Sequence, residues 1–192
     1  ILKSNQMERR EALKRVAYLM GGAISATTMG VLFESFTVLD KSKMVNFSVS
    51  DEAILAEFAD IIIPTTSACP GAKAAGLGTF IPMMIQDCYP ANLQEMFASG
   101  LKSMDDKCFA KFGKNFVTAS EQERNSIVTE LRDEAVANKR KPSFFTIARD
   151  LTILGYYSSE IGCTQAREYV AIPGKYDGSA PLEPGQKAWA TS

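Results

Sequence analysis

The segment at residues 143–162 limits the possible folds more strongly than any other part of the chain. After Ser143 it reads FFTIARDLTILGYYSSEIG, which is apolar on nearly all sides apart from Arg149, Asp150 and Glu160. Serine is a favoured helix N-cap, so the spacing predicts a helix that Ser143 opens and that runs to residue 162. A helix that is hydrophobic all round belongs at the centre of a helical bundle or against another protein.

Four further helices are expected before it, at residues 51–62, from residue 78 or 82 to 88, at 91–112, and from 120 to the basic run 139–141. In the first, third and fourth of these, apolar residues recur at helical spacing. Ser50 is the expected N-cap of the first helix, and Ser120 with Glu123 forms a capping box for the fourth. No strand pattern alternates with these helices, so we predict an all-α chain with a compact helical bundle. The expected inner residues are Leu93, Met96, Phe97, Leu101, Met104, Cys108 and Phe112 of the third helix and Ile127, Val128, Leu131 and Val136 of the fourth.

The first 34 residues have the pattern of an export signal. Basic residues outnumber acidic ones in the first fifteen positions, and residues 16–33 carry no charge and are moderately apolar. A basic region before an apolar region is typical of exported proteins. Arg9, Arg10, Leu13 and Lys14 resemble the twin-arginine translocation signature. The alternative interpretation is a basic, amphipathic first helix.

These features divide the chain into three parts. We expect residues 1–34 to be a twin-arginine-type signal or anchor helix, residues 35–50 a linker, and residues 51–192 a helical domain with an irregular tail from residue 163. The tail has proline or glycine every few residues, which is too many for a central helix or strand. We interpret it as an extended tail that wraps a surface. Periplasmic localisation, with or without contact to the membrane, follows from the signal.

Two features of the composition exclude whole classes of function. The chain has no histidine, so a Ser-His-Asp or Cys-His site, a zinc site with imidazole ligands and a histidine-ligated haem are excluded. Its 21 basic and 22 acidic residues leave a net charge of -1, which does not supply the basic field that nucleic-acid binding requires. We expect no catalytic, cofactor or metal site in this chain.

The four cysteines are Cys69, Cys88, Cys108 and Cys163, and no two of them form a Cys-x-x-Cys motif. A zinc ribbon, an iron–sulfur cluster or a c-type haem attached to this chain is therefore not expected. The open alternatives are buried small side chains, unreactive thiols, partners in a disulfide, and thiols that pair with another subunit.

Several motifs together resemble the gluconate 2-dehydrogenase subunit 3 family. Residues 144–162, followed by YVAIPGKYDG at 169–178, look like its carboxy-terminal hallmark. The sequences IIPTT at 62–66 and PGAKAAG at 70–76, then Phe80-Ile81 and Asp87-Cys88-Tyr89, resemble its amino-terminal half. The chain departs from the pattern at Pro82 and Ser179, where many relatives have an acidic residue and a cysteine.

The resemblance implies a function as an accessory subunit. The small subunits of this family accompany a large flavoprotein of the glucose-methanol-choline (GMC) type, which oxidises a sugar, polyol or sugar acid with FAD, and frequently a c-type cytochrome. The small subunit carries no cofactor and supports the folding, twin-arginine export and stability of the flavoprotein. By resemblance, FAD would lie in the partner and haem c in a third subunit.

The apolar helix and the tail are the parts expected to contact the partner. The candidate interface residues are Arg149, Tyr156, Tyr157, Glu160, Tyr169, Tyr176 and Trp189. For each aromatic residue the alternative is an internal core position, and for Arg149, Asp150 and Glu160 it is a buried or interfacial ion-pair network. Two other functions remain open: a stand-alone enzyme with Glu160 as general acid or base, and an exported envelope protein whose apolar helix meets lipid.

Overall fold

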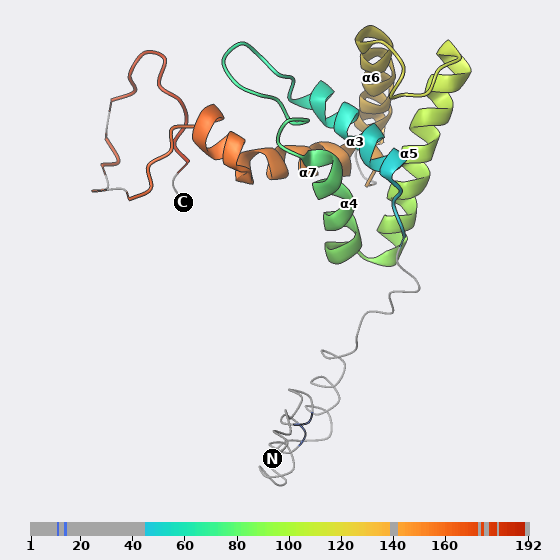
Figure 1. The fold of residues 1–192 in the computed structure, drawn as a ribbon, viewed down its shortest axis with the longest axis horizontal. Helices are drawn as coiled ribbons and strands as arrows, with labels where there is room; N and C mark the ends of the chain where they lie inside the picture. Colours follow the sequence, from blue (N-terminus) through green and yellow to red (C-terminus); the bar gives the residue numbers. More distant parts are fainter. Residues whose placement is uncertain are drawn as a thin grey trace, which may run out of the picture. The chain divides into compact units, whose positions relative to one another are not determined.

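The computed structural model describes residues 11, 14, 45–138, 142–172, 174, 177–179 and 181–190. The chain divides into two units, Ile1–Ser42 and Lys43–Ser192. The second unit contains α3 (Val49–Ile62), α4 (Leu77–Cys88), α5 (Ala91–Phe112), α6 (Glu121–Ala137), α7 (Phe144–Ser158) and the short π-helix η2 (Gly162–Ala166) (Figure 1). Its described residues contain no strand, only an isolated bridge between Glu168 and Trp189. The predicted all-α class is confirmed.

Only two residues of the first unit are described. Glu11 and Lys14 are helical and exposed. The other residues of the twin-arginine pattern, Arg9, Arg10 and Leu13, lie outside the described residues, so the export signal stays a prediction. Within the described part of the chain, no helix combines the length and hydropathy needed to cross a bilayer.

The bounds of α5 and the start of α6 are as predicted, whereas α6 ends at Ala137, before the basic run 139–141 that was expected to close it. α5 starts directly after Pro90 and ends at Gly113, whose φ of 67° is the left-handed conformation that glycine adopts without strain. At the start of α6 the Ser120 hydroxyl accepts a hydrogen bond from the Glu123 amide at 3.3 Å, and the Glu123 carboxylate accepts one from the Ser120 amide at 2.6 Å. The basic run 139–141 lies outside the described residues.

The N-cap of α3 is Ser48, so the prediction of Ser50 is wrong. The Ser48 hydroxyl accepts from the Asp51 amide at 3.2 Å, and the Asp51 carboxylate accepts from the Ser48 amide at 2.8 Å. This reciprocal pair needs an acidic or amide side chain three positions after the serine. Ser50 has Ala53 at that position.

The folded domain also begins before the predicted end of the linker at residue 50. The Gln86 side chain donates to the Val45 carbonyl at 2.8 Å, and the Val45 amide donates to the Gln94 side chain at 3.3 Å. The Phe47 ring packs edge-on against Phe97, with centroids 6.0 Å apart. These contacts attach residues 45–48 to α4 and α5.

α4 begins at Leu77, one residue before the earlier of the two predicted starts, and continues through Pro82. Proline has no amide hydrogen, so one backbone hydrogen bond of the helix is missing there. The Pro82 ring is buried, so α4 loses this hydrogen bond while the ring packs inside the domain. Gly78 lets α4 approach α3 closely, because a Cβ atom at this position would lie 2.6 Å from the Glu52 carbonyl oxygen.

Aromatic packing around Phe144 forms the centre of the core. The Phe144 ring lies 5.6 Å from the ring of Phe58 on α3 and 4.9 Å from that of Phe97 on α5, measured between centroids. At Gly100 a Cβ atom would overlap the Phe144 side chain, so glycine is required where α5 meets α7.

The prediction that Val136 lies in the core is wrong, since its side chain is 55% exposed on α6.

A group of three charged side chains joins α3, the loop at residues 63–76 and α6. Glu57 pairs with both Lys73 and Arg124, and the side chains of Glu57 and Arg124 are mostly buried. Burial raises the pKa of Glu57, but the Lys73 hydrogen bond and the charges of Arg124 and Lys73 outweigh it and hold the pKa below its ordinary value. The ionised carboxylate therefore stabilises the fold.

The Glu57→Gln variant is expected to lower the free energy of unfolding by about 1–3 kcal/mol at neutral pH. Because the folded-state pKa is depressed, this stabilisation is complete above the unfolded-state pKa of about 4.3 and is lost as pH falls through the folded-state pKa. Urea unfolding of both proteins at neutral pH and at about pH 3 measures how much stability the substitution removes at each pH. Equal stability of the two proteins at neutral pH would contradict the prediction.

Glu134→Gln is the matched control. Glu134 pairs with Lys107 at 2.6 Å, but its side chain is exposed. Removing an exposed pair changes stability by only about 0.5 kcal/mol, because solvent screens it.

Candidate functional site

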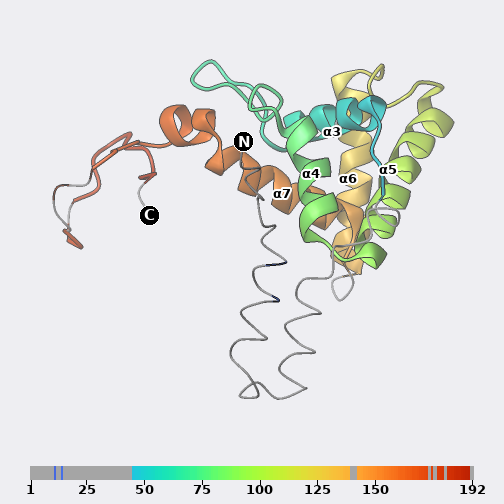
Figure 2. The ribbon, with the colours of Figure 1, turned by 60° about the horizontal axis from the view of Figure 1, so that its bottom comes forward.

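α7 carries apolar residues on two faces, and only one of them is buried in its own domain. The inner face packs on α3, α4, α5 and α6 and comprises Phe144, Phe145, Ile147, Ala148, Leu151, Thr152, Gly155 and Tyr156. On the other side Ile153, Leu154 and Tyr157 are 42%, 54% and 37% exposed. We call these three residues the outer face of α7. The C-terminal half of the helix extends beyond the other helices (Figure 2).

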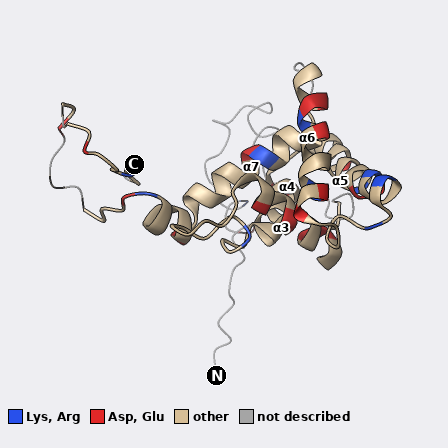
Figure 3. Ribbon diagram, turned by 90° about the horizontal axis from the view of Figure 1, so that it is seen from above, with Lys and Arg blue, Asp and Glu red and all other residues tan. Residues whose placement is uncertain are grey.

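The outer face lies on a part of α7 without charge. From Leu151 to Ser159 the sequence has no charged residue, whereas α5 and α6 carry both acidic and basic residues (Figure 3). Single exposed apolar residues are ordinary on protein surfaces, but neighbouring ones on an uncharged surface indicate an interaction site. The sequence-based expectation that this helix meets another protein stays a prediction.

α7 ends at Ser158, so its predicted continuation to residue 162 is wrong. The Ser159 amide and hydroxyl both donate to the Tyr156 carbonyl, at 3.1 and 2.7 Å, and this local bonding competes with the helical pattern. The Ser159 hydroxyl then accepts from the Gly162 amide at 3.1 Å. A Cβ atom at residue 162 would overlap the Tyr156 carbonyl oxygen. The chain therefore turns here and continues as η2, a helix type often found near functional sites.

Tyr157 is held at the edge of this turn with part of its ring exposed. The Arg167 guanidinium lies 4.5 Å from the centre of the Tyr157 ring, and the Tyr156 ring lies 5.3 Å away, edge-on. The Cys163 thiol donates to the Tyr157 carbonyl at 3.2 Å. These contacts restrict the ring before any partner binds, which suits an aromatic interface anchor.

Tyr156 is a core residue, so its prediction as an interface anchor is wrong and the internal alternative holds. Its ring is buried, its hydroxyl donates to the Pro70 carbonyl at 2.7 Å, and the Cys69 sulfur lies 3.1 Å from the same oxygen. Burial raises the pKa of Tyr156 most, and the hydrogen bond with Cys69 raises it further, to about 12. The residue attaches the loop at 63–76 to α7.

Arg149, Asp150 and Glu160 do not form the buried network that was one alternative. Arg149 donates to the adjacent Asp150 at 2.7 Å, and both side chains are about half exposed. Glu160 is exposed and takes no part in that pair, so aromatic residues do not enclose its carboxylate. Tyr169 and Trp189 are about half exposed, and Tyr176 lies outside the described residues.

The four cysteines are all described, and each is a free thiol in the structure. Cys108 is buried in the core, Cys88 is exposed, and Cys69 and Cys163 are partly buried. Burial is the main cause that raises the pKa of the Cys108 thiol, and the nearby charges of Asp105 and Glu123 raise it further. Pairing of any of them with another subunit stays a prediction.

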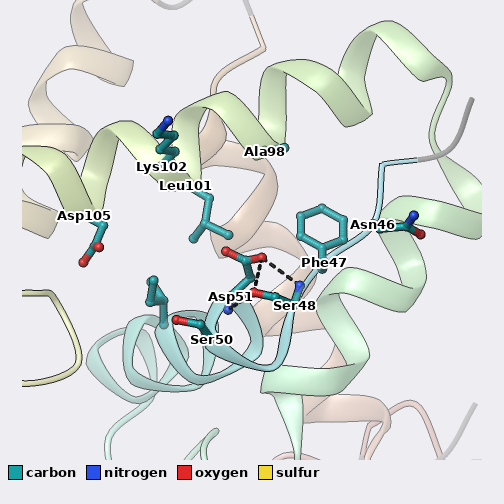
Figure 4. Close-up of a pocket in the computed structure, with 10 residues that line it drawn as sticks. Asn46, Phe47, Ser48, Ser50, Asp51, Ala98, Leu101, Lys102 and Asp105 are labelled. Carbon is teal, nitrogen blue, oxygen red and sulfur yellow. Dashed lines mark hydrogen bonds between the residues drawn. The ribbon is translucent and has the colours of Figure 1, made fainter.

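A cavity of about 320 Å³ lies between the start of α3 and the middle of α5 (Figure 4). Asp51 and Asp105 line it, but both carboxylates have structural partners. Asp51 caps α3, and Asp105 accepts from the Phe116 amide at 2.7 Å. Within the described part of the chain, no group of histidine, cysteine and acidic side chains is placed to hold a metal ion.

A second polar cavity, of about 300 Å³, lies between the end of α3 and the start of α6 and was not expected from the sequence. Asp60 and Arg124 line it, and each has one buried polar atom without a hydrogen-bond partner in the chain. A cavity of this size and polarity suits ordered water.

Comparison with known proteins gives one match. The family model described as Gluconate 2-dehydrogenase subunit 3 matches residues 50–174. This range includes nearly all of α3, every later helix and the start of the tail. No curated protein and no solved structure matches the chain.

The thiols are expected to differ in reactivity. Iodoacetamide should modify the exposed Cys88 at least about tenfold faster than Cys108, because the Cys108 thiolate is disfavoured by burial and also inaccessible. Timed labelling of the native protein, followed by peptide mass spectrometry, measures each rate. Labelling in guanidinium chloride is the control, where the rates should converge. Equal native rates would contradict the burial of Cys108.

Proposed function

Since the chain belongs to the gluconate 2-dehydrogenase subunit 3 family, we propose that it is the non-catalytic accessory subunit of an FAD-dependent sugar, glycoside or sugar-acid dehydrogenase. The matched residues 50–174 comprise almost the whole helical bundle. The family is named for a subunit of the gluconate 2-dehydrogenase complex, so this chain is an accessory subunit of a complex of that type.

The outer face of α7 is the observation that carries the proposal. The inner face of the same helix already fills the core, so the domain gains nothing further from Ile153, Leu154 and Tyr157. Burying such side chains against a partner contributes about 1.5–3 kcal/mol for each fully buried one. A large apolar partner surface is therefore the natural complement of this face.

The proposed partner is a large flavoprotein of the GMC type, which would hold FAD and oxidise the sugar. A c-type cytochrome with haem c would be a third subunit. In this arrangement the residues of the present chain bind and stabilise the flavoprotein and transfer neither protons nor electrons. Arg9, Arg10, Leu13 and Lys14 would direct the folded complex to the periplasm by the twin-arginine pathway, with or without peripheral contact with the membrane.

The outer face of α7 is too small to hold a partner by itself. A stable protein–protein interface buries about 800 Å² on each partner, or roughly 20–30 residues a side. The segment that follows η2, residues 167–190, which we call the arm, exposes Tyr169 and Trp189. Because Arg167 at its start stacks on Tyr157, the arm and the outer face form a continuous surface for one partner.

The Leu154→Glu variant is expected to reduce recovery of the flavoprotein at least about tenfold, because a charge in the centre of an apolar interface is desolvated without a partner. The measurement is native purification of the tagged chain from its own cells, with flavin absorbance and mass spectrometry of every co-purifying polypeptide. Val136→Glu is the matched control, since Val136 on α6 and Leu154 are 55% and 54% exposed. It should recover flavoprotein like the unmodified chain.

Three outcomes would overturn the proposal or part of it. A folded, colourless chain recovered without any flavoprotein would overturn the accessory role. Substrate turnover by the isolated chain, lost in Glu160→Gln, would support the enzyme alternative instead. Equal recovery of flavoprotein by Leu154→Glu and Val136→Glu would remove the outer face of α7 from the interface.

A further inference from the structure

The arm folds back on itself at its base. The Glu168 amide donates to the Ala188 carbonyl at 2.9 Å, and the Ala190 amide donates to the Glu168 carbonyl at 2.9 Å, which forms the bridge between Glu168 and Trp189. The Lys187 ammonium donates to the Gln165 carbonyl of η2. These bonds hold Trp189 beside the start of the arm, although the two positions are far apart in the sequence.

The arm lines an open cavity of about 840 Å³, which we call the arm groove. Its lining residues are Glu168, Asp177, Pro181, Leu182, Glu183, Gln186, Lys187, Ala188 and Trp189. The apolar side chains of the groove do not pack into the bundle, since Leu182 is 83% and Trp189 is 53% exposed. A groove that combines exposed apolar and polar side chains is typical of surfaces that receive another chain.

The charged groups of the groove are mostly acidic. Three carboxylates line it, those of Glu168, Asp177 and Glu183, and Lys187 is the single basic residue among its lining residues. Lys187 is already bonded to a backbone carbonyl. Among the ion pairs of the described residues, none includes any of these three carboxylates. The groove therefore presents negative charge beside exposed apolar surface.

We propose that the arm groove binds a basic segment of the partner flavoprotein, with a lysine or arginine side chain in the groove. This inference rests on the proposed function. Long basic side chains pack their aliphatic part on apolar surface and keep the charged end in a polar environment. Here Leu182 and Trp189 would receive the aliphatic part, and the carboxylates of the groove would surround the charged end. The Trp189 ring adds a cation–π contribution.

Charge complementarity selects this occupant over two others. An acidic protein segment would meet like charge in the groove, which costs binding free energy. Anionic lipid headgroups would be repelled for the same reason, because membrane surfaces attract basic rather than acidic segments. Continuity with the outer face of α7, through the stacking of Arg167 on Tyr157, places the groove where the same partner would reach it.

The triple variant E168Q/D177N/E183Q tests the proposal in the complex purified with the flavoprotein. We expect it to weaken association at least about tenfold at low salt and to lose most of the salt dependence of the unmodified complex. Dissociation constants at about 50 mM and about 500 mM NaCl provide the measurement. Trp189→Ala removes the aromatic surface without a change of charge, and we expect a similar loss of affinity with the salt dependence retained.

The control E95Q/D106N/E121Q neutralises the same number and type of acidic residues at exposed positions on α5 and α6. The control has the same net charge as E168Q/D177N/E183Q, so it separates an effect of the groove from an effect of net charge. Its affinity for the flavoprotein should change less than about twofold. Circular dichroism and thermal unfolding check that each variant keeps the helical bundle.

The outcomes separate the groove from the proposed function. If E168Q/D177N/E183Q binds the flavoprotein with unchanged affinity and salt dependence while Leu154→Glu does not bind, the groove proposal is overturned and the accessory role stands. If the unmodified chain recovers no flavoprotein, both are overturned. If the unmodified chain sediments with phosphatidylglycerol vesicles and Trp189→Ala abolishes this, lipid occupies the groove. That result would overturn the proposal that a protein segment occupies it.

Discussion

The packing of Phe144 between α3 and α5 is the contact on which the helical domain depends. Its ring meets Phe58 and Phe97, and the missing side chain at Gly100 leaves the space that it occupies. Because Phe144 is the first residue of α7, this contact fixes the start of the helix in the core. The C-terminal half of the helix extends beyond α3, α4, α5 and α6 (Figure 1).

This geometry explains how one apolar helix serves two purposes. The inner face of α7 fills the core and, through the hydroxyl of Tyr156, holds the loop at residues 63–76. The outer face remains free because no other described element of the domain covers Ile153 and Leu154. Folding accounts for the first set of residues, and the proposed association with a partner would account for the second. The family to which the chain belongs agrees with that division, since its members are subunits of larger complexes.

The proposed contact surface is restricted before a partner binds. Arg167 stacks on Tyr157, and the bridge between Glu168 and Trp189 closes the arm. Surfaces that are ordered in advance lose less conformational entropy on binding, so more of the contact energy is retained as affinity. The two parts also differ in chemistry, because the outer face of α7 is uncharged and the arm groove is acidic. An apolar contact would supply affinity, and a charged contact would supply orientation and selectivity.

Local signals in the sequence determined the helical class, the bounds of α5 and the capping box of α6, because these depend on residues at most four positions apart. They also identified α7 as an apolar helix and placed Tyr157 and Trp189 among the candidate interface residues, and both side chains are partly exposed. The cap of α3 at Ser48 and the end of α7 at Ser158 also depend on local contacts, of Ser48 with Asp51 and of Ser159 with Tyr156, which the sequence-based predictions did not include. Only the tertiary structure decided that Tyr156 lies in the core while its neighbour Tyr157 lies at the surface. Adjacent residues on an apolar helix have nearly the same sequence environment, and the direction that each faces is set by contacts with residues such as Pro70, which is 86 positions away from Tyr156. For the same reason the carboxylates of the arm groove were not predicted, because they meet only when the arm closes.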